Sequence, residues 1–411
     1  MEGGGQGGGG WAGHQRRSPA YRRLLAAMFF AGVATFAQLY SFQPLLPALT
    51  RTFDVTAAGA ALTVSAATLG LAAAVIPWSQ FADAVGRVPA MRLSVAAATL
   101  LGLAALLSPR FELVVAFRLL EGCALGGVPA VAMAYVNEEV HRAHAARAAA
   151  TYVAGTSIGG LAGREVSGPV AHWTGHWNLG VGATLALCVA AAVAFSVLVP
   201  PARGFIPHRA RAGDFVPRGS LVHKVAVNLK NPRTRLLFIH GFLLMGAFVA
   251  MYNYLGFHLE GPPYGLPPTA VDLLFMAYLI GTAGSYVTGA LAERFGRRRV
   301  YLAFLTAFLA GAVLTLAGPL WVIIAGLLIL TAGFFGAHAV AQSWAVALAT
   351  EGKAQASSLY NLFYYAGSSA LGWFGGHLMR WFGWPGMAAM VIAAVALILA
   401  TALARCGEPA G

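Results

Sequence analysis

Long apolar runs, separated by short polar stretches, set the pattern of hydrophobic and polar positions along this chain. A helix needs about 20 apolar residues to cross a bilayer, and no stretch shows the apolar–polar alternation of a barrel strand. Twelve runs approach that length: residues 24–48, 57–81, 90–108, 112–136, 148–171, 177–199, 235–256, 269–291, 300–317, 319–346, 355–379 and 385–404. The pattern therefore predicts an all-α integral membrane protein with twelve transmembrane helices.

Two charged turns break this apolar pattern in the same way. An acid-x-x-Gly-Arg turn begins at Asp83 after the second run, and another begins at Glu293, 293 − 83 = 210 residues later, after the eighth run. The segment AGTSIGGLAG at 154–163 matches AGSSALGWFG at 366–375 at nearly the same offset. Such parallel repeats are typical of transporters that bind a substrate between their halves.

The repeat divides the chain into segments. We expect a disordered Gly-rich leader at 1–23, one six-helix bundle at 24–199, a basic linker at 200–234, a second bundle at 235–405 and a tail at 406–411. The leader is assigned from its low complexity.

Composition and charge agree with a membrane protein. The chain is 58% hydrophobic and 10% charged, whereas a soluble domain has about 25% charged residues. The net charge of +13 comes from basic residues that gather in the loops of one side, which is the positive-inside bias. This predicts cytoplasmic termini, a multi-pass protein of a bacterial-type inner membrane, and no nucleic-acid partner.

The three cysteines are too scattered for a disulfide or zinc framework. The sequence has no Walker loop, GxGxxG or Gly-x-Ser-x-Gly motif. No cofactor, metal site or enzymatic activity is therefore expected, and the chain is expected to act as a monomer.

The paired turns, the Arg118-x-x-Glu121-Gly122 motif of the fourth run and the Gly-rich fifth run resemble the major facilitator superfamily (MFS) over residues 24–405. FQPLLPALTRTF (42–53) and YVAGTSIGGLAGR (152–164) resemble bacterial proton-coupled efflux permeases of the drug and sugar type. The resemblance implies a fold of two six-helix repeats. It also implies a cytoplasmic latch at the charged turns, formed by Asp83, Gly86, Arg87, Glu293, Gly296 and Arg297. The alternative for these turns is a plain topology anchor.

Small residues recur every four positions in the fifth run, which lets two helix backbones approach closely. The stripe contains Gly155, Gly159 and Gly163, with Gly160 beside it. A gating role and simple helix packing are both open interpretations.

Four intramembrane charges lie in the first half: Arg118, Glu121, Arg164 and Glu165. The aligned positions of the second half are Ile329, Ala332, Gly376 and His377. Charges inside a membrane are costly unless they are paired or face water, and a carboxylate beside an arginine can exchange a proton. We expect proton coupling here, with Glu121 as first candidate because it lies in the motif, Glu165 as second and His338 as a fallback. A static salt-bridge network is the alternative.

Polar and aromatic groups at membrane depth suit a cavity for a neutral or weakly polar small molecule. They are Gln38, Tyr40, Gln43, Tyr252, Asn253, His338, Gln342 and Asn361. The predicted function is proton-coupled efflux of a small organic solute by alternating access. The alternatives are an importer or uncoupled facilitator, and a non-transporting membrane sensor or intramembrane enzyme.

Overall fold

The computed structural model describes residues 11–204 and 218–405, and helix is the regular structure throughout these residues, apart from one isolated bridge between His14 and Val140. The N-terminal half contains α1 (Pro19–Tyr40), η1 (Gln43–Leu45), α2 (Leu46–Phe53), α3 (Ala57–Val85), α4 (Arg87–Leu106), α5 (Phe111–Leu125), α6 (Gly127–Glu139), α7 (Arg142–Thr174) and α8 (Trp177–Leu198). The C-terminal half contains α9 (Arg218–Lys230), α10 (Pro232–Leu259), α11 (Pro268–Asp272), η2 (Leu273–Met276), α12 (Ala277–Phe295), α13 (Arg297–Leu314), α14 (Leu320–Leu348) and α15 (Lys353–Arg405). Helix thus occupies each of the twelve predicted apolar runs.

Local sequence explains where several helices begin and end. The Thr56 hydroxyl caps α3 by accepting from the Gly59 amide at 3.0 Å, and Asn231 caps α10 by accepting from the Arg233 amide at 3.0 Å. Gly86 (φ +102°) and Gly296 (φ +84°) make the turns between α3 and α4 and between α12 and α13. A side chain would strain both positions.

Eight helical stretches in the described part of the chain are long and apolar enough to cross a membrane. They are Pro19–Phe53, Ala57–Val85, Arg87–Leu106, Phe111–Glu139, Trp177–Leu198, Pro232–Leu259, Leu320–Leu348 and Gln355–Ala404. The last stretch joins two predicted runs, because α15 continues past a non-helical residue at Gly383. All-helical membrane architecture follows from these stretches.

The two halves repeat one packing motif. In α7, a Cβ on Gly155, Gly159 or Gly163 would collide with the backbone of Phe29, Val33 or Ala37 of α1, respectively. In α15, a Cβ on Gly367 would collide with the backbone of Phe242 in α10. Each small-residue segment therefore lies directly against the first membrane-length helix of its own half, α1 or α10.

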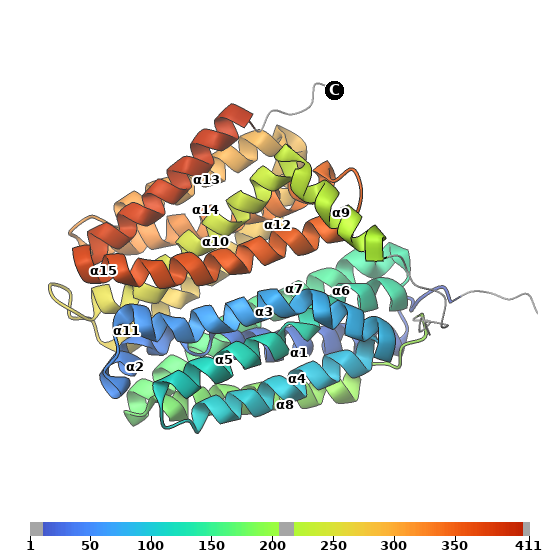
Figure 1. The fold of residues 1–411 in the computed structure, drawn as a ribbon, viewed down its shortest axis with the longest axis horizontal. Coiled ribbons are helices and arrows are strands. Elements are labelled where there is room, and N and C mark those ends of the chain that lie inside the picture. The colour runs from blue at the N-terminus through green and yellow to red at the C-terminus, as the bar shows by residue number, and fades with distance from the viewer. Residues whose placement is uncertain (1–10, 205–217, 406–411) are drawn as a thin grey trace, which may run out of the picture.

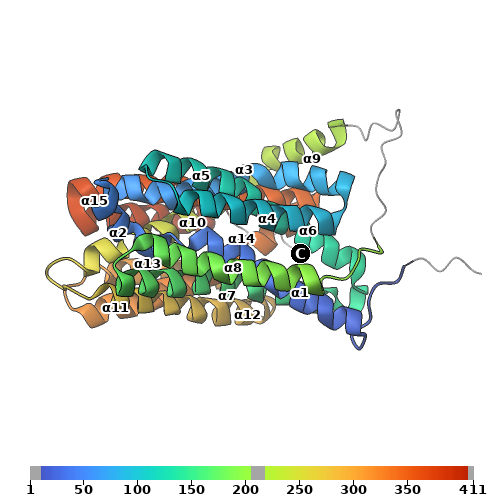
Figure 2. The same ribbon diagram turned by 90° about the horizontal axis from the view of Figure 1, so that it is seen from below.

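The halves meet toward one end of the molecule. Figures 1 and 2 place α2 and α11 at one end, here called the α2/α11 end, and α6 and α9 at the other, the α6/α9 end. One cluster of buried apolar residues joins the C-terminal half to residues such as Leu45, Leu49 and Leu71. A second cluster contains described residues of the N-terminal half alone, among them Met28 and Tyr135. The apolar contact between halves therefore favours the α2/α11 end.

Two segments that flank the predicted bundles contain ordered structure. Residues 1–10 lie outside the described residues, but the rest of the expected disordered leader is ordered, because α1 begins at Pro19 and the amide of His14 donates to the Glu139 carbonyl at 2.7 Å. The expected linker at 200–234 includes α9, which the Asn228 side chain joins to the Glu351 carbonyl at 2.9 Å. Apolar runs alone did not predict either feature, because neither segment contains a long apolar stretch.

Candidate functional site

Arg164 of α7 lies at the contact between the halves and is 2% exposed. Its Nε donates to Oε1 of Gln43 at 2.6 Å, and Nη1 donates to the Gly160 carbonyl at 2.5 Å. Its Nη2 donates to the Tyr278 hydroxyl of the C-terminal half at 3.3 Å. All three acceptors are neutral.

Gln43 carries this network across the interface. Its Nε2 donates to Oδ1 of Asn253 in α10 at 2.7 Å, while its Oε1 accepts from Arg164. The Nδ2 of Asn253 is buried and has no hydrogen-bond partner among the described residues. A chain of three polar side chains thus joins the halves and ends in an unused donor.

Aromatic rings surround the Arg164 guanidinium. Its Cζ lies 4.1 Å from the ring centroid of Tyr40, 4.4 Å from that of Tyr278 and 5.5 Å from that of Phe275. Cation–π contacts of this kind stabilise a desolvated cation. The site therefore has an apolar wall with a positive charge at its centre.

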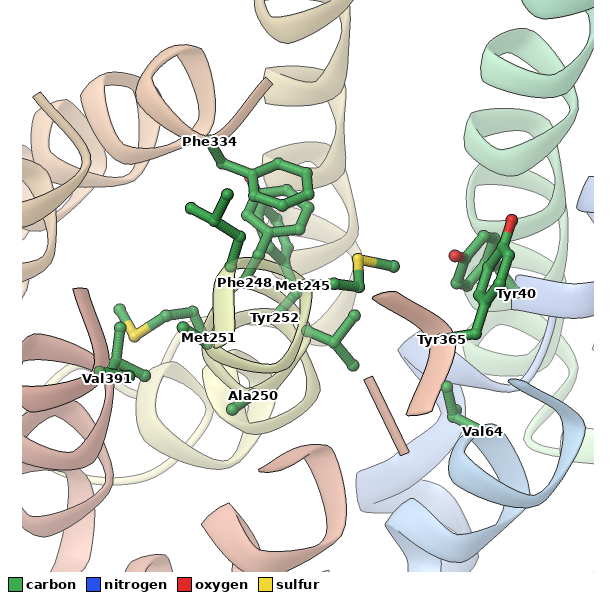
Figure 3. Close-up of a cluster of buried hydrophobic side chains, with 14 of the residues drawn as sticks. Tyr40, Val64, Met245, Phe248, Ala250, Met251, Tyr252, Phe334, Tyr365 and Val391 are labelled. Atoms are coloured by element: carbon green, nitrogen blue, oxygen red, sulfur yellow. The ribbon is translucent and has the colours of Figure 1, made fainter. Parts of the chain in front are cut away.

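From Tyr278 the aromatic wall extends to Phe248 of α10, whose ring centroid lies 5.3 Å from that of Tyr278. Phe248 stacks on Phe334 with ring centroids 3.8 Å apart, and Tyr252 lies beside Phe248 with centroids 5.0 Å apart (Figure 3). The Tyr252 hydroxyl is paired with Thr331 at 2.7 Å. The predicted cavity residue Tyr252 thus contributes its ring rather than a free hydroxyl.

A second cluster of charged groups joins the halves nearer the α2/α11 end. Nδ1 of His172 in α7 lies 2.9 Å from Oδ2 of Asp272 in α11. A Cβ on Gly168 would fall 2.5 to 2.6 Å from the Asp272 carboxylate, so only glycine leaves room for it. Arg51 and Glu260 form another inter-half pair at 3.7 Å.

Glu165 lies in the electrostatic field of Arg164 and Asp272 without pairing with a cation within 4 Å among the described residues. Its Oε1 is buried and has no hydrogen-bond partner in the described part of the chain. A desolvated carboxylate oxygen without a donor is unfavourable while it is charged. The position suits a group that takes up and releases a proton.

Arg118 and Glu121, the first coupling candidates, are closed off within the N-terminal half. Arg118 is 0% exposed and its Nη1 lies 2.7 Å from Oε2 of Glu121, which is 1% exposed. The remaining donors of Arg118 reach the carbonyls of Thr63, Gln38 and Leu39. The predicted cavity residue Gln38 belongs here as well, since its Nε2 donates to the Ala98 carbonyl at 2.6 Å.

The remaining predicted cavity residues form two pairs between α14 and α15. Nδ1 of His338 lies 3.0 Å from the Tyr360 hydroxyl, and Gln342 donates to Asn361 at 3.2 Å. These groups are satisfied within the C-terminal half. Among the described residues they share no hydrogen bond with the Arg164 network, but the His338 ring stacks on Phe334 of the aromatic wall, with centroids 5.9 Å apart.

The two charged turns differ in their pairing. Arg87 contacts Asp83 at 2.5 Å and Glu138 of α6 at 2.8 Å. Among the described residues, no opposite charge lies within 4 Å of Glu293 or Arg297, which instead line a cavity of about 590 Å³ with Trp344. The repeat therefore preserves the turn and not its ion pairs.

Sequence reasoning missed Asp272, His172 and Tyr278. Asp272 is an acid inside the predicted run 269–291 and could have been flagged by the cost of a charge at that depth. Nothing in the local pattern of Tyr278 or His172 indicates a contact across the halves.

The comparisons with known proteins agree with this arrangement. The family model described as Major Facilitator Superfamily matches residues 28–267 and 261–410. The chain is 37% identical over 393 residues to the "Uncharacterized MFS-type transporter YybF" of Bacillus subtilis, covering 95% of this chain and 96% of that protein. It is also 37% identical to the "Inner membrane transport protein YnfM" of Escherichia coli, covering 95% and 93%.

Solved structures match the whole fold at low identity. The xylose transporter XylE from E. coli, in a partially occluded inward-open conformation, is 12% identical with a TM-score of 0.75 and covers 96% of this chain and 99% of its own. The nucleoside transporter NupG is 13% identical with a TM-score of 0.72, covering 94% and 99%. At this identity the likeness concerns the fold alone.

Proposed function

The chain belongs to the Major Facilitator Superfamily, and from that premise we propose that it is a proton-coupled secondary transporter of a small organic solute. It is a membrane transporter and not an enzyme. We place it in a bacterial inner membrane, with all twelve helical runs crossing the bilayer. The basic turns near Arg87 and Arg297 support a cytoplasmic α6/α9 end through the positive-inside rule.

The observation that carries the proposal is the polar contact between the halves. Arg164, Gln43 and Asn253 join the two repeats through side-chain hydrogen bonds, and the His172–Asp272 contact adds a titratable link. Such contacts can break and re-form when two rigid halves rock about a central site. Alternating access requires contacts between the halves that can be broken and re-formed, and these hydrogen bonds meet that requirement.

The arrangement supports an inward-facing state. The ion pairs Arg51–Glu260 and His172–Asp272 connect the halves near the α2/α11 end. The second apolar cluster, at the α6/α9 end, contains described residues of the N-terminal half alone. With the α6/α9 end cytoplasmic, the outer side is closed and the substrate site is reached from the cytoplasm.

For the proton carrier we propose Glu165, assisted by Asp272 and His172. Glu165 has a buried oxygen without a donor and lies next to the inter-half contact. Glu121 is the alternative carrier, and its pairing with Arg118 suits a structural role better. This reverses the order that the motif alone favoured.

The direction of transport is proposed from the resemblance of residues 42–53 and 152–164 to bacterial efflux permeases, which supports export. Import and uncoupled facilitation are the alternatives. The membrane-sensor alternative lacks a supporting observation, since the family match covers both halves of the chain.

A flux assay in proteoliposomes with an imposed pH gradient tests the proposal. Drugs, sugars, nucleosides and organic anions are screened, with a protonophore as control. The wild type is expected to concentrate at least one solute until the gradient collapses. Glu165→Gln should lose this accumulation and keep downhill exchange. Glu121→Gln should keep both when flux is normalised to the amount of folded protein, because this variant breaks the buried pair with Arg118.

Two results would contradict the proposal. Accumulation that survives the protonophore would remove proton coupling altogether. Equal accumulation by the Glu165→Gln, Glu121→Gln and double variants would make the charged groups structural and move the search for a carrier to His338.

A further inference from the structure

The N-terminal half buries two arginines, one with a carboxylate partner and one without such a partner among the described residues. Arg118 has a carboxylate partner, Glu121, at 2.7 Å. Arg164 is 2% exposed and has no carboxylate within 4 Å among the described residues. A buried charge is strongly unfavourable unless it is paired. Arg164 therefore lacks a counter-charge that its surroundings require.

The donors around Arg164 outnumber the acceptors. A guanidinium has five N–H groups, and three of them reach Gln43, Gly160 and Tyr278. Two N–H groups of Arg164 thus remain without a described acceptor. The buried Nδ2 of Asn253, linked to Arg164 through Gln43, is also without one.

Glu165 does not fill the role of a structural counter-ion. It follows Arg164 directly on α7, so the two side chains point about 100° apart around the helix. The separation exceeds 4 Å, and the buried Oε1 of Glu165 lacks a donor of its own. Arg164 and Glu165 therefore do not form an ion pair in this state, although a direct contact would give each side chain a partner.

The aromatic rings beside Arg164 indicate the chemical class of ligand that this site can bind. Tyr40, Tyr278 and Phe275 present apolar faces around the guanidinium. An apolar body with one acidic group matches a positive centre within an aromatic wall.

We propose that Arg164, together with the Asn253 amide, is the recognition site for an organic anion. The substrate class is a small molecule that carries one carboxylate or sulfonate-type group on an apolar body. The anionic group accepts from the free N–H groups of Arg164, and the body packs on Tyr40 and Tyr278. This replaces the neutral solute expected from the sequence, and it rests on the proposed transport function.

Binding to the purified protein in detergent tests the inference without requiring transport. The probes are benzenesulfonate and benzoate, each compared with its uncharged amide, and binding is followed by isothermal titration. The wild type is expected to bind each anion at least tenfold more tightly than the matched amide. Arg164→Gln should lose that preference, and Arg164→Lys should keep part of it because the charge remains while the planar fork is lost.

Arg92→Gln is the matched control. It removes a positive charge from the same half, at an exposed side chain whose contact is the Ser196 carbonyl at 2.7 Å. It should bind the anions as the wild type does. Thermal unfolding of each variant establishes that Arg164→Gln is folded, and Asn253→Ala provides a second test by weakening anion binding with Arg164 intact.

The inference is overturned if neither anion is preferred over its amide, or if Arg164→Gln and Asn253→Ala both retain the preference. Failure of the transport proposal looks different, because flux would be absent while anion binding remained. Flux of neutral or cationic solutes alone, unaffected by Arg164→Gln, would overturn the inference and leave the transporter assignment in place.

Discussion

At the scale of single residues, the Arg118–Glu121 pair and the unpaired Arg164 should differ in what they contribute to stability. Arg118→Gln leaves Glu121 buried at 1% exposure without its partner. Removing one member of a buried pair costs about 3–5 kcal/mol. The midpoint of thermal unfolding should therefore fall sharply for Arg118→Gln.

The variant to compare with it is Arg164→Gln, which removes a buried positive charge but leaves no carboxylate without its partner. Its unfolding midpoint should stay close to that of the wild type, and the double variant Arg118→Gln/Glu121→Gln should recover part of the loss. Equal destabilisation by Arg118→Gln and Arg164→Gln would mean that Arg164 has a structural counter-charge.

Anion binding at Arg164 should depend on the protonation of Glu165. The charged groups acting on Glu165 are Arg164 on its own helix and Asp272 on α11. Protonation of Glu165 removes a negative charge beside the anion, so benzenesulfonate should bind more tightly as the pH falls from about 8 to about 5.5. Titration at several pH values measures this, since the sulfonate stays charged throughout.

In Glu165→Gln the affinity should be independent of pH and close to the low-pH value of the wild type. A pH dependence that persists in this variant would assign the proton to Asp272 or His172. The sign also bears on direction. The expected sign favours import, the alternative to the proposed export, because a proton and an anion that strengthen each other's binding travel together. Tighter anion binding at high pH would instead support export by antiport, in which proton and anion compete.

At the scale of elements, the α1–α7 contact within the N-terminal half holds Arg164 of α7 against the Tyr40 ring of α1. A Cβ on Gly159 would lie 2.7 Å from the Val33 Cα. Gly159→Leu should therefore overpack the contact at a cost of about 1–3 kcal/mol, and the turnover rate should drop while the amount of inserted protein changes little.

Gly182→Leu on α8 is the control for this substitution. Among the described residues, the atom within 4 Å of a Cβ there is Cδ2 of the flexible Leu106 side chain, at 3.8 Å. Wild-type turnover in Gly159→Leu, or an equal loss in both variants, would show that close approach of α1 and α7 is not needed for function.

The ordered segment before α1 should respond to pH. Burial lowers the pKa of His14 below its ordinary value of 6.5, although the Glu139 charge opposes the shift. The ordered segment before α1 is therefore more stable when His14 is neutral. The contribution of neutral His14 to the stability of the ordered segment before α1 is complete above pH 6.5. This contribution is lost as the pH falls from 6.5 through the lowered pKa that His14 has in the ordered segment.

Trypsin cleavage at Arg16 and Arg17 provides the readout. Cleavage should accelerate below pH 6.5 relative to a site elsewhere on the same protein, and His14→Gln should remove the pH dependence. Acceleration of the same size in His14→Gln would assign the effect to another group at the α6/α9 end.

At the scale of the whole molecule, the fold could be predicted from sequence because its signals are local and repeated. Each apolar run became helix, and the spacing of Gly155, Gly159 and Gly163 matches their contacts with α1. Cognate turns at Gly86 and Gly296 identified the two halves.

The site was less predictable because it depends on contacts between residues far apart in the chain. Glu121 and Glu165 looked equivalent from their neighbouring arginines, but only Glu121 is paired. Tyr278 and Asp272 enter the site through the packing of α7 against α11 and α12, which no spacing in the sequence encodes. Polar residues of α14 and α15 paired with each other instead.

The central claim is that the two halves rock about the Arg164 contact, and paired spin-label distances in lipid nanodiscs test it most directly. One pair, at Trp173 and Leu316, reports on the α2/α11 end, and the other, at Ala143 and Phe295, reports on the α6/α9 end; all four residues are exposed. The background lacks the three native cysteines. When the pH and benzenesulfonate are varied, the account predicts a second population in which the first distance lengthens and the second shortens. A single unchanged distance at both ends, or a change in the same sense at both, would contradict it.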